Sequence, residues 1–548
     1  MSAPDWIILI STLACIILYG IYKSRTTKNL DGYFLSNQSM PWYMVLLSIM
    51  GTQASAITFL SAPGQAYTDG MRFVQYYFGL PLAMIVICIF FVPVFRKLKV
   101  YTAYEFLENR FDKKTRSLTS ALFLISRGLS TGISIYAPSI ILSSLLDWNI
   151  YYTNLVMGGL LIIYTMSGGA KAVAYTQQLQ LIIIIAGMFL AGYMVVKLLP
   201  DGMGFSHALQ IAGSHGKMNV ITTGVTNGKF DWKDKYNIWS GVIGGFFLAL
   251  SYFGADQSQV GRYLTAKTEK ESKIGLLTNG LVKVPMQFLI LLVGVMVFSF
   301  YQYNKAPVYF DSAKVVLAKN TVYKDSLINL EQQYNTAQAS NDQDKKTVLR
   351  AQYKNVLQKA LPGDEANDTN FIFLRFVIDN LPKGLVGLLI AVIFLAAWGS
   401  IAAALNSLAS CTVVDFHKEY VDKNCTEAMD YRISKWYTFA WGIFCIIVAM
   451  FAHNIGNSLI EAVNILGSLF YGVILGIFLV AFWIRSVKGN AVFVAALISE
   501  LLVILIFKLD VISFLWLNVI GALLVIFLSL LLQPILYSNA RRLAGRNN

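Results

Sequence analysis

Polar side chains interrupt an apolar segment over residues 41–62. Its middle, SIMGTQASAIT (48–58), carries five hydroxyl or amide side chains and a glycine. In a bilayer every backbone polar group must be satisfied, so such an interruption is tolerated only where it lines a protected cavity. An opened helix there offers carbonyl oxygens to a cation and half-helix ends to a polar solute. A polar contact between two intact helices is the alternative interpretation.

Residues 238–256 form a second apolar segment with polar and small residues. It ends in SYFGAD (251–256), which Gln257 follows. Tyr252 is a candidate gate that closes a cavity, or else a packing residue. Asp256 lies near one end of the segment, where we expect it to pair with Arg262.

The segment 377–411 contains AAWGSIAAALNS (396–407). Small residues of this kind allow helices to approach closely, which is one reading of the run. The other is a cation site, in which the Ser400 hydroxyl and the carbonyls of Ala396 and Gly399 supply oxygen ligands.

Two basic residues fall inside apolar segments. Arg127 follows Arg116 by 11 residues, roughly 16 Å along a helix. A charge at that depth costs on the order of 3 kcal/mol and is expected to face a cavity or a partner. Lys283 is closer to the end of its segment, where its side chain is also able to reach the surface.

One apparent enzyme motif lies in the wrong structural context. Residues 128–132 (GLSTG) fit the GxSxG pattern of hydrolases, but that motif needs a strand-to-helix turn and a histidine partner. Here it lies in an apolar helical segment. No phosphate loop, zinc motif or dinucleotide fingerprint occurs. We therefore expect no enzymatic activity and no cofactor.

The composition is that of a membrane protein. Hydrophobic residues make up 56% of the 548 residues and charged residues only 14%, against about 25% charged in soluble domains. Apolar runs near 20 residues, the length that crosses a bilayer, recur along the whole chain. We predict an all-α protein that forms one polytopic domain (1–548) with about thirteen crossings: 5–22, 41–62, 77–95, 118–146, 150–167, 177–199, 238–256, 276–302, 377–411, 437–452, 457–484, 491–507 and 511–537.

The net charge of +14 does not indicate nucleic acid, because the basic residues gather in short loops on one predicted side. Such loops face the cytoplasm, which places the N-terminus outside and the C-terminus inside a cell membrane. The sequence suggests the lipid bilayer and a small-molecule substrate as partners, and no obligate protein partner. The basic loops are 23–28, 96–99, 110–116, 262–273, 418–435, 485–488 and 541–546.

One polar insertion, residues 303–370, separates two apolar segments and is predicted to be extracytoplasmic. Apolar residues recur near helical spacing over 323–360. A solvated helical hairpin is the simpler interpretation, and a lid or a partner-binding element is the other.

Stretches such as YTAYEFLENRF (101–111) and ALNSLASCTVVDFHKEY (404–420) resemble the sodium/solute symporter family, whose members carry sugars, proline, iodide, vitamins, monocarboxylates and sialic acid with sodium. The resemblance covers nearly the whole chain. The matching stretches are SAITFLSAPGQAYTDG (55–70), YTAYEFLENRF (101–111), IYAPS (135–139), YTMSGGAKAVAYTQQLQ (164–180), DQSQVGRYLTAK (256–267), LVKVPMQF (281–288) and ALNSLASCTVVDFHKEY (404–420).

The resemblance implies a core of two inverted five-helix repeats over 41–484, with a discontinuous first helix, followed by two additional helices over 491–537. It assigns sodium ligands to Gly51, Ala54, Ala396, Gly399 and Ser400. Position 399 is usually Ser or Thr in the family, and Gln53 is a guess for the missing oxygen. Gln177 stands where many members have an acidic residue, which makes a second sodium ion doubtful.

For the substrate, the family's contacts fall on residues of the first, second, third, sixth and seventh core helices. The arginine resembles the residue that holds the carboxylate in sialic acid carriers, which favours a sugar acid or a monocarboxylate. Neutral sugars, polyols and vitamins, or coupling to protons, are the alternatives. The candidate substrate contacts are Gln53, Ser55, Thr58, Gln75, Arg127, Tyr252 and Lys283.

Overall fold

The computed structural model describes residues 1–24, 30–146, 148–340, 342–362, 366–423, 426–452 and 458–544. Parts of three basic loops used to predict orientation (23–28, 418–435 and 541–546) therefore lie outside the described residues. So do small parts of the insertion.

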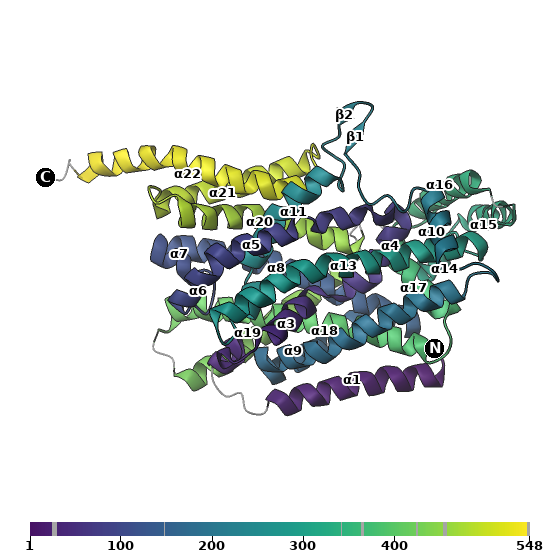
Figure 1. The fold of residues 1–548 in the computed structure, drawn as a ribbon, viewed down its shortest axis with the longest axis horizontal. Coiled ribbons are helices and arrows are strands. Elements are labelled where there is room, and N and C mark those ends of the chain that lie inside the picture. Colours follow the sequence, from purple (N-terminus) through teal and green to yellow (C-terminus); the bar gives the residue numbers. More distant parts are fainter. Residues whose placement is uncertain are drawn as a thin grey trace.

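The protein is a bundle of apolar helices (Figure 1). In the described part of the chain, ten helical stretches are long and apolar enough to cross a membrane, and 150–166 and 240–254 are shorter apolar helices. A helical membrane fold is thus confirmed, while the count of thirteen crossings and the internal repeat stay predictions. The main helices are α1 (Ala3–Ser24), α3 (Trp42–Gln53), α4 (Ala56–Asp69), α5 (Leu80–Val86), α6 (Val92–Leu98), α8 (Lys113–Leu146), α9 (Ile150–Lys197), α11 (Gly245–Gly254), α13 (Glu269–Tyr303), α18 (Leu385–Cys411), α19 (Glu427–Phe451), α20 (Leu459–Trp483), α21 (Gly489–Lys508) and α22 (Phe514–Ala544).

Shorter elements join these helices. One two-stranded hairpin, with Val225 opposite Phe230, departs from an all-helical chain. The predicted segment 377–411 is divided, because Pro382 and Gly384 (φ 90°) end one helix before the next begins. The short elements are α2 (Leu30–Leu35), η1 (Ser36–Gln38), η2 (Gly70–Tyr77), η3 (Ile87–Phe91), α7 (Glu105–Arg110), α10 (Phe205–Ser214), β1 (Val225–Thr226), β2 (Lys229–Phe230), η4 (Ser240–Gly244), α12 (Gln257–Tyr263), α17 (Thr369–Asn380) and η5 (Thr412–Val421).

Helix α9 reverses direction along its length. The hydroxyls of Tyr164 and Thr176 lie 2.6 Å apart although 12 residues separate them. A straight helix would hold their backbones about 18 Å apart. The helical path therefore folds back between these positions, which gives the two separate apolar arms that the sequence predicts.

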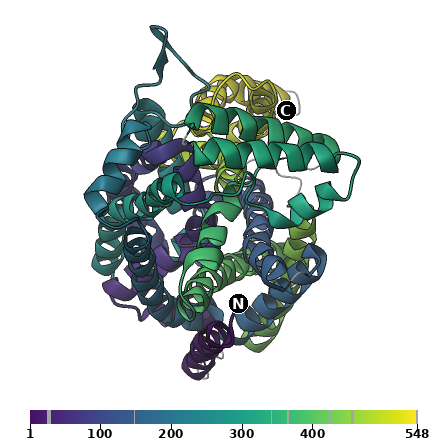
Figure 2. The same cartoon turned by 90° about the vertical axis from the view of Figure 1, so that its right-hand side faces the viewer.

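The insertion folds as three helices, α14 (Ser312–Lys319), α15 (Lys324–Ala339) and α16 (Gln343–Ala360). They share a small apolar cluster of their own, distinct from the core of the bundle. Figures 1 and 2 show α15 and α16 lying across the helix ends, at the end of the molecule where the N-terminus lies.

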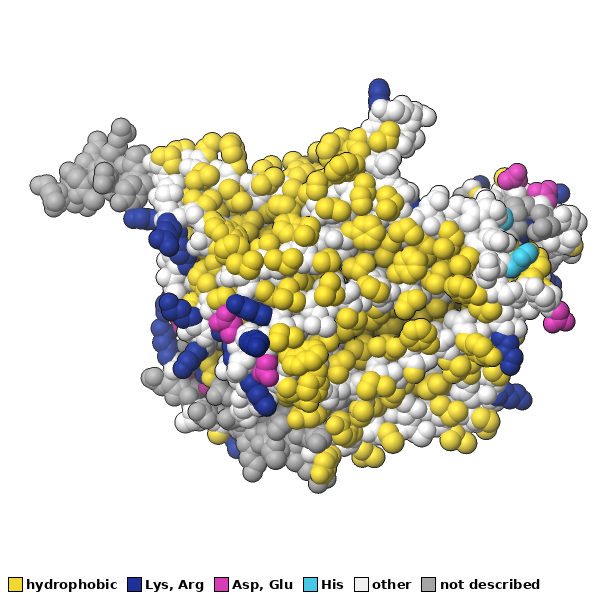
Figure 3. All heavy atoms as spheres, in the orientation of Figure 1, with side chains coloured by type: hydrophobic (Ala, Val, Ile, Leu, Met, Phe, Trp, Pro, Cys, Tyr) yellow, Lys and Arg dark blue, Asp and Glu magenta, His cyan; other side chains and the backbone are white. Residues whose placement is uncertain are grey.

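Charge distribution distinguishes the two ends of the bundle. Apolar side chains cover its broad middle, and Lys and Arg gather at the end that carries the C-terminus (Figure 3). This pattern is the one that the positive-inside rule describes.

Asp368 anchors the insertion to the bundle. Its buried carboxylate lies 2.9 Å from both Arg350 and Lys354 of α16 and accepts a hydrogen bond from the Phe310 backbone N–H at 3.0 Å. Burial opposes ionisation of this carboxyl, but the two cations outweigh it and hold the pKa of Asp368 below its usual range. The anchor is therefore ionised at neutral pH.

Asp368→Asn is expected to loosen the insertion, because two partly buried cations lose their counter-charge. Limited proteolysis should cut within residues 312–360 several times faster than in the parent, with the bundle still folded. Asp325→Asn, an exposed position on α15, is the matched control and should cut at the parental rate. Equal protection of both variants would show that Asp368 does not hold the insertion.

Candidate functional site

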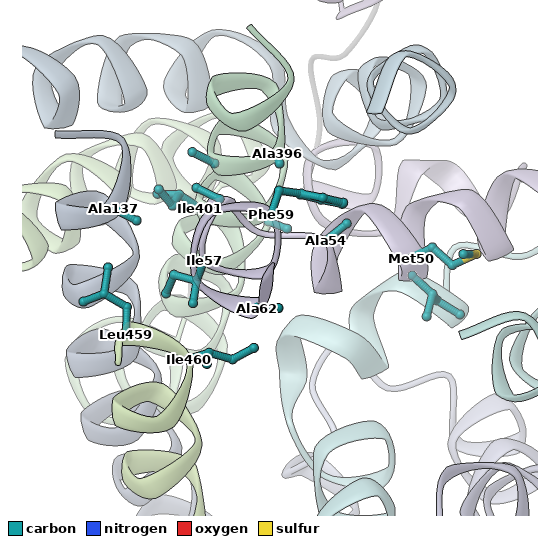
Figure 4. Packing of buried hydrophobic residues seen from close by; sticks show 14 of the residues in the cluster. Met50, Ala54, Ile57, Phe59, Ala62, Ala137, Ala396, Ile401, Leu459 and Ile460 are labelled. Atoms are coloured by element: carbon teal, nitrogen blue, oxygen red, sulfur yellow. The ribbon is translucent and has the colours of Figure 1, made fainter. Parts of the chain in front are cut away.

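The helix break predicted within 48–58 is present, between α3 and α4 (Figure 4). The Ser55 N–H donates to the Gln53 carbonyl at 2.9 Å, and the Thr58 N–H donates to the Ser55 carbonyl at 3.0 Å. In an intact α-helix these two donors would bind the carbonyls of Gly51 and Ala54. Both carbonyl oxygens thereby lose their helical donors.

Helix α18 passes beside this break and contacts both α3 and α4, and Figure 4 labels its Ala396 next to Phe59 of α4. The Ser400 hydroxyl donates to the carbonyls of Ala396 and Ala397 at 3.0 and 3.1 Å. Its oxygen keeps lone pairs that can accept a cation. Together with the freed carbonyls, the set consists of neutral oxygens, which suits a hard cation.

Gln177 of α9 joins α3, the helix before the break, to α18. Its side-chain oxygen accepts from Ser48 at 2.8 Å, and its nitrogen donates to the Thr52 hydroxyl at 3.2 Å and the Gly399 carbonyl at 3.0 Å. A Cβ at Gly51 would lie 2.9 Å from the Gln177 side chain. The glycine therefore leaves the space that this buried amide occupies.

The space beside Gly399 is also filled. A Cβ there would lie 2.5 Å from the Gln180 side-chain oxygen. Gln53, the residue guessed to replace the missing side chain at 399, donates instead to Asn279 of α13 at 3.0 Å. The Gly399 carbonyl, one of the predicted sodium ligands, is engaged by Gln177.

A cavity of about 150 Å³ opens next to the break. Of the predicted substrate contacts, Gln53, Ser55, Thr58, Arg127, Tyr252 and Lys283 line it, and so does Ser400. Polar lining residues that the sequence did not single out are Thr52, Tyr76, Tyr77, Thr131, Ser134, Ser258, Asn464 and Tyr471.

Gln75 does not line this cavity. Its fully buried amide donates to the Thr222 hydroxyl and the Tyr236 carbonyl and accepts from the Thr222 N–H. It ties η2 to the loop before η4. The next residue along, Tyr76, faces the cavity instead and donates to Asn464 at 3.0 Å.

Arg127 is already paired. Its guanidinium forms an ion pair with Asp256 and donates to the Tyr471 hydroxyl at 2.8 Å, while Tyr471 donates to Asp256 at 2.9 Å. The guanidinium carbon also lies 5.4 Å from the centre of the Tyr252 ring. The sequence analysis expected Arg127 to bind a carboxylate of the substrate. In the structure its charge is instead paired with the carboxylate of Asp256.

The predicted pairing of Asp256 with Arg262 is wrong. Asp256 caps α12 by accepting from the Ser258 N–H at 2.8 Å, and Arg262 lies six residues further on. Six residues rotate an α-helix by about 240° and advance it about 9 Å, so the two side chains diverge. Arg262 is fully buried and donates to Asn406 at 3.3 Å.

Lys283 provides the cavity's uncompensated charge. Its side chain is buried, and its ammonium lies 5.7 Å from the centre of the Tyr77 ring. No carboxylate lies within ion-pair distance of it among the residues that the structure describes. A buried ammonium of this kind favours an anionic ligand.

A broken helix with freed carbonyls, beside a polar cavity within an apolar helix bundle, defines a membrane carrier. A sequence model of the sodium:solute symporter family matches residues 33–334 and 348–499. The chain belongs to that family.

Two relatives match nearly the full chain. The sodium/sialic acid symporter NanT of Aliivibrio fischeri is 27% identical over 98% of this chain and 94% of its own. The sodium/sialic acid symporter SiaT of Proteus mirabilis is 25% identical over 98% and 96%. A solved sodium-coupled sialic acid symporter, in a substrate-bound outward-open state, has the same fold, with a TM-score of 0.78, 24% identity and coverage of 97% of this chain and 98% of that one.

The pairing of Arg127 with Asp256 predicts how their variants behave. Arg127→Gln and Asp256→Asn should each destabilise the protein by about 3–5 kcal/mol, because each leaves a buried charge unpaired. The double variant removes both charges and should unfold, in detergent, at a higher temperature than either single variant. Additive losses in the double variant would mean that the ion pair does not stabilise the fold.

Proposed function

We propose that the protein couples the entry of a carboxylated sugar, such as sialic acid, to the entry of sodium. The observation that carries the proposal is Lys283, a buried cation without a carboxylate partner among the described residues, in a cavity beside freed backbone oxygens. The names of the two full-length relatives support the same substrate class.

The substrate carboxylate would bind Lys283. An unpaired buried charge carries a desolvation cost. An anion that pairs with the Lys283 ammonium offsets that cost, and this favours binding of the anion. Arg127 remains a hydrogen-bond donor at the edge of the site, with its charge balanced by Asp256. The hydroxyls of Thr131 and Ser134 and the amide of Asn464 are suited to the neutral hydroxyls of a sugar.

Sodium would bind the carbonyls of Gly51, Ala54 and Ala396 and the Ser400 hydroxyl. Ser55 and Thr58, on the other side of the same break, line the substrate cavity. An ion that fixes the geometry of the break thereby fixes the substrate contacts, which is a direct route to coupling. Because Gln177 already donates to Gly399 and Thr52, we propose a single sodium ion.

The same reasoning extends to the membrane arrangement. We propose thirteen crossings with an inverted repeat over 41–484, two further helices over 491–537, an outer N-terminus and an insertion on the outer face. The concentration of Lys and Arg at the end with the C-terminus supports this orientation (Figure 3).

A neutral sugar or polyol is the second candidate, since Lys283 can also donate to hydroxyls and Arg127 is neutralised within the protein. The two candidates differ in transported charge. One sodium ion with a neutral solute gains about 2.3 kcal/mol per 100 mV. One sodium ion with a monoanion moves no net charge and is driven only by the ion gradient, about 1.4 kcal/mol per tenfold ratio.

Purified protein in liposomes should accumulate N-acetylneuraminic acid when an inward sodium gradient is imposed. An inside-negative potential should leave the initial rate unchanged, because the co-transported charges cancel. Replacing sodium by potassium, or imposing only a proton gradient, should abolish accumulation. A substrate-dependent inward current, or uptake driven by protons alone, would contradict this coupling.

Ser400→Ala should raise the sodium concentration for half-maximal uptake roughly tenfold or more, since it removes a ligand of a charged group. Ser407→Ala is the matched control, because Ser407 lies on the same helix and its hydroxyl also donates to a carbonyl four residues earlier, at 2.9 Å. That control should keep the parental sodium dependence. Identical sodium dependence in both variants would remove Ser400 from the ion site.

A further inference from the structure

Helix α13 carries a buried polar stripe that continues beyond the cavity. Asn279, Lys283 and Gln287 follow one another at intervals of four residues, so their side chains lie on one face. All three are buried. Lys283 lines the cavity, and Gln287 lies one turn further along, about 6 Å by helical rise.

The amide of Gln287 is unpaired in the described structure. Neither its side-chain nitrogen nor its oxygen has a hydrogen-bond partner among the described residues, and its exposed fraction is 0%. Leaving a buried amide unsatisfied costs about 1–3 kcal/mol. Asn279, in the same stripe, is partly unpaired too. Its side-chain oxygen accepts a hydrogen bond from Gln53, but its side-chain nitrogen has no partner among the described residues.

Neighbouring glycines show what Gln287 faces. Gly280, Gln287 and Gly294 are spaced by seven residues and lie nearly on one line along the helix. A Cβ at Gly280 would lie 2.8 Å from Met84 of α5, and one at Gly294 would lie 2.1 Å from the Pro63 carbonyl of α4. Gln287 therefore lies where α13 passes from α5 to α4, and both of these helices contribute lining residues to the cavity, Leu80 of α5 and Thr58 of α4.

We propose that Gln287 binds the hydroxyl-bearing side chain of the substrate, beyond the carboxylate held near Lys283. An amide offers both donors and an acceptor, which suits neutral hydroxyl groups and not a second carboxylate. Lys283 lines the cavity and Gln287 does not, so the tail of the substrate reaches Gln287 by entering between α13 and α4 as it binds. This inference rests on the proposed function and adds a preference for acids with a polyol tail.

The test compares two acids that differ only in that tail. N-acetylneuraminic acid is one probe, and the same acid with its glycerol side chain shortened by mild periodate oxidation and borohydride reduction is the other. Gln287→Met should raise the KM for the intact acid about five- to tenfold, the loss of one or two hydrogen bonds. It should leave the KM for the shortened acid at the parental value.

Two controls keep the result interpretable. Ser299→Ala, on the same helix, removes a buried hydrogen bond to the Ala208 carbonyl and should change neither KM. Gln287→Met should unfold at or above the parental temperature, because it replaces an unsatisfied amide by an apolar side chain of similar length.

The outcomes are distinct. Equal effects of Gln287→Met on both acids, or none on either, would overturn the contact with the tail while leaving the proposed function intact. If the parent protein takes up neither acid with sodium, the proposed function fails and this inference falls with it.

Discussion

The interruption of one helix at Ala54 and Ser55 is the constraint on which the rest of the structure depends. The N–H groups of Ser55 and Thr58 bind carbonyls that are two and three residues earlier, not four as in an α-helix. The carbonyl oxygens of Gly51 and Ala54 therefore lack their helical donors. Such a break would be costly in hydrocarbon. Side chains from two other helices hold the residues around the break in place. Gln177 of α9 bonds to both α3 and α18, and Asn279 of α13 accepts a hydrogen bond from Gln53.

Charge balance divides the cavity into two parts. Arg127, Asp256 and Tyr471 form a closed group in which the charges cancel. Lys283 sits apart from it, over an aromatic ring. A balanced pair stabilises a fixed packing of α8 against α12 and α20, whereas an unbalanced cation creates a demand for an anion. We therefore propose that the residues that hold the helices together are separate from Lys283, the residue that selects the ligand.

Much of this could be predicted because membrane burial makes polar residues conspicuous. The break within 48–58 follows from polar groups in an apolar segment, and the resemblance to the family placed Lys283 among the residues that line the cavity. The partner of Asp256 could not be predicted, because Arg262 is near in sequence but rotated away on α12, while Arg127 approaches from α8. The sequence also did not indicate which side chains of η2 face the cavity. Gln75 binds the loop before η4, whereas Tyr76 and Tyr77 line the cavity. The resemblance to the family implied an acidic residue at the position of Gln177 but did not indicate that the glutamine amide would bridge Thr52 and Gly399.

We propose that one break in one helix serves both the ion and the substrate, so their binding free energies must be linked. The most direct measurement is calorimetric titration of the purified protein with N-acetylneuraminic acid, at zero and at saturating sodium with potassium as the replacement, together with the converse sodium titration. We expect sodium to tighten binding of the acid about tenfold or more, and the acid to tighten sodium binding by the same factor. Affinities for the acid that are equal with and without sodium would contradict it.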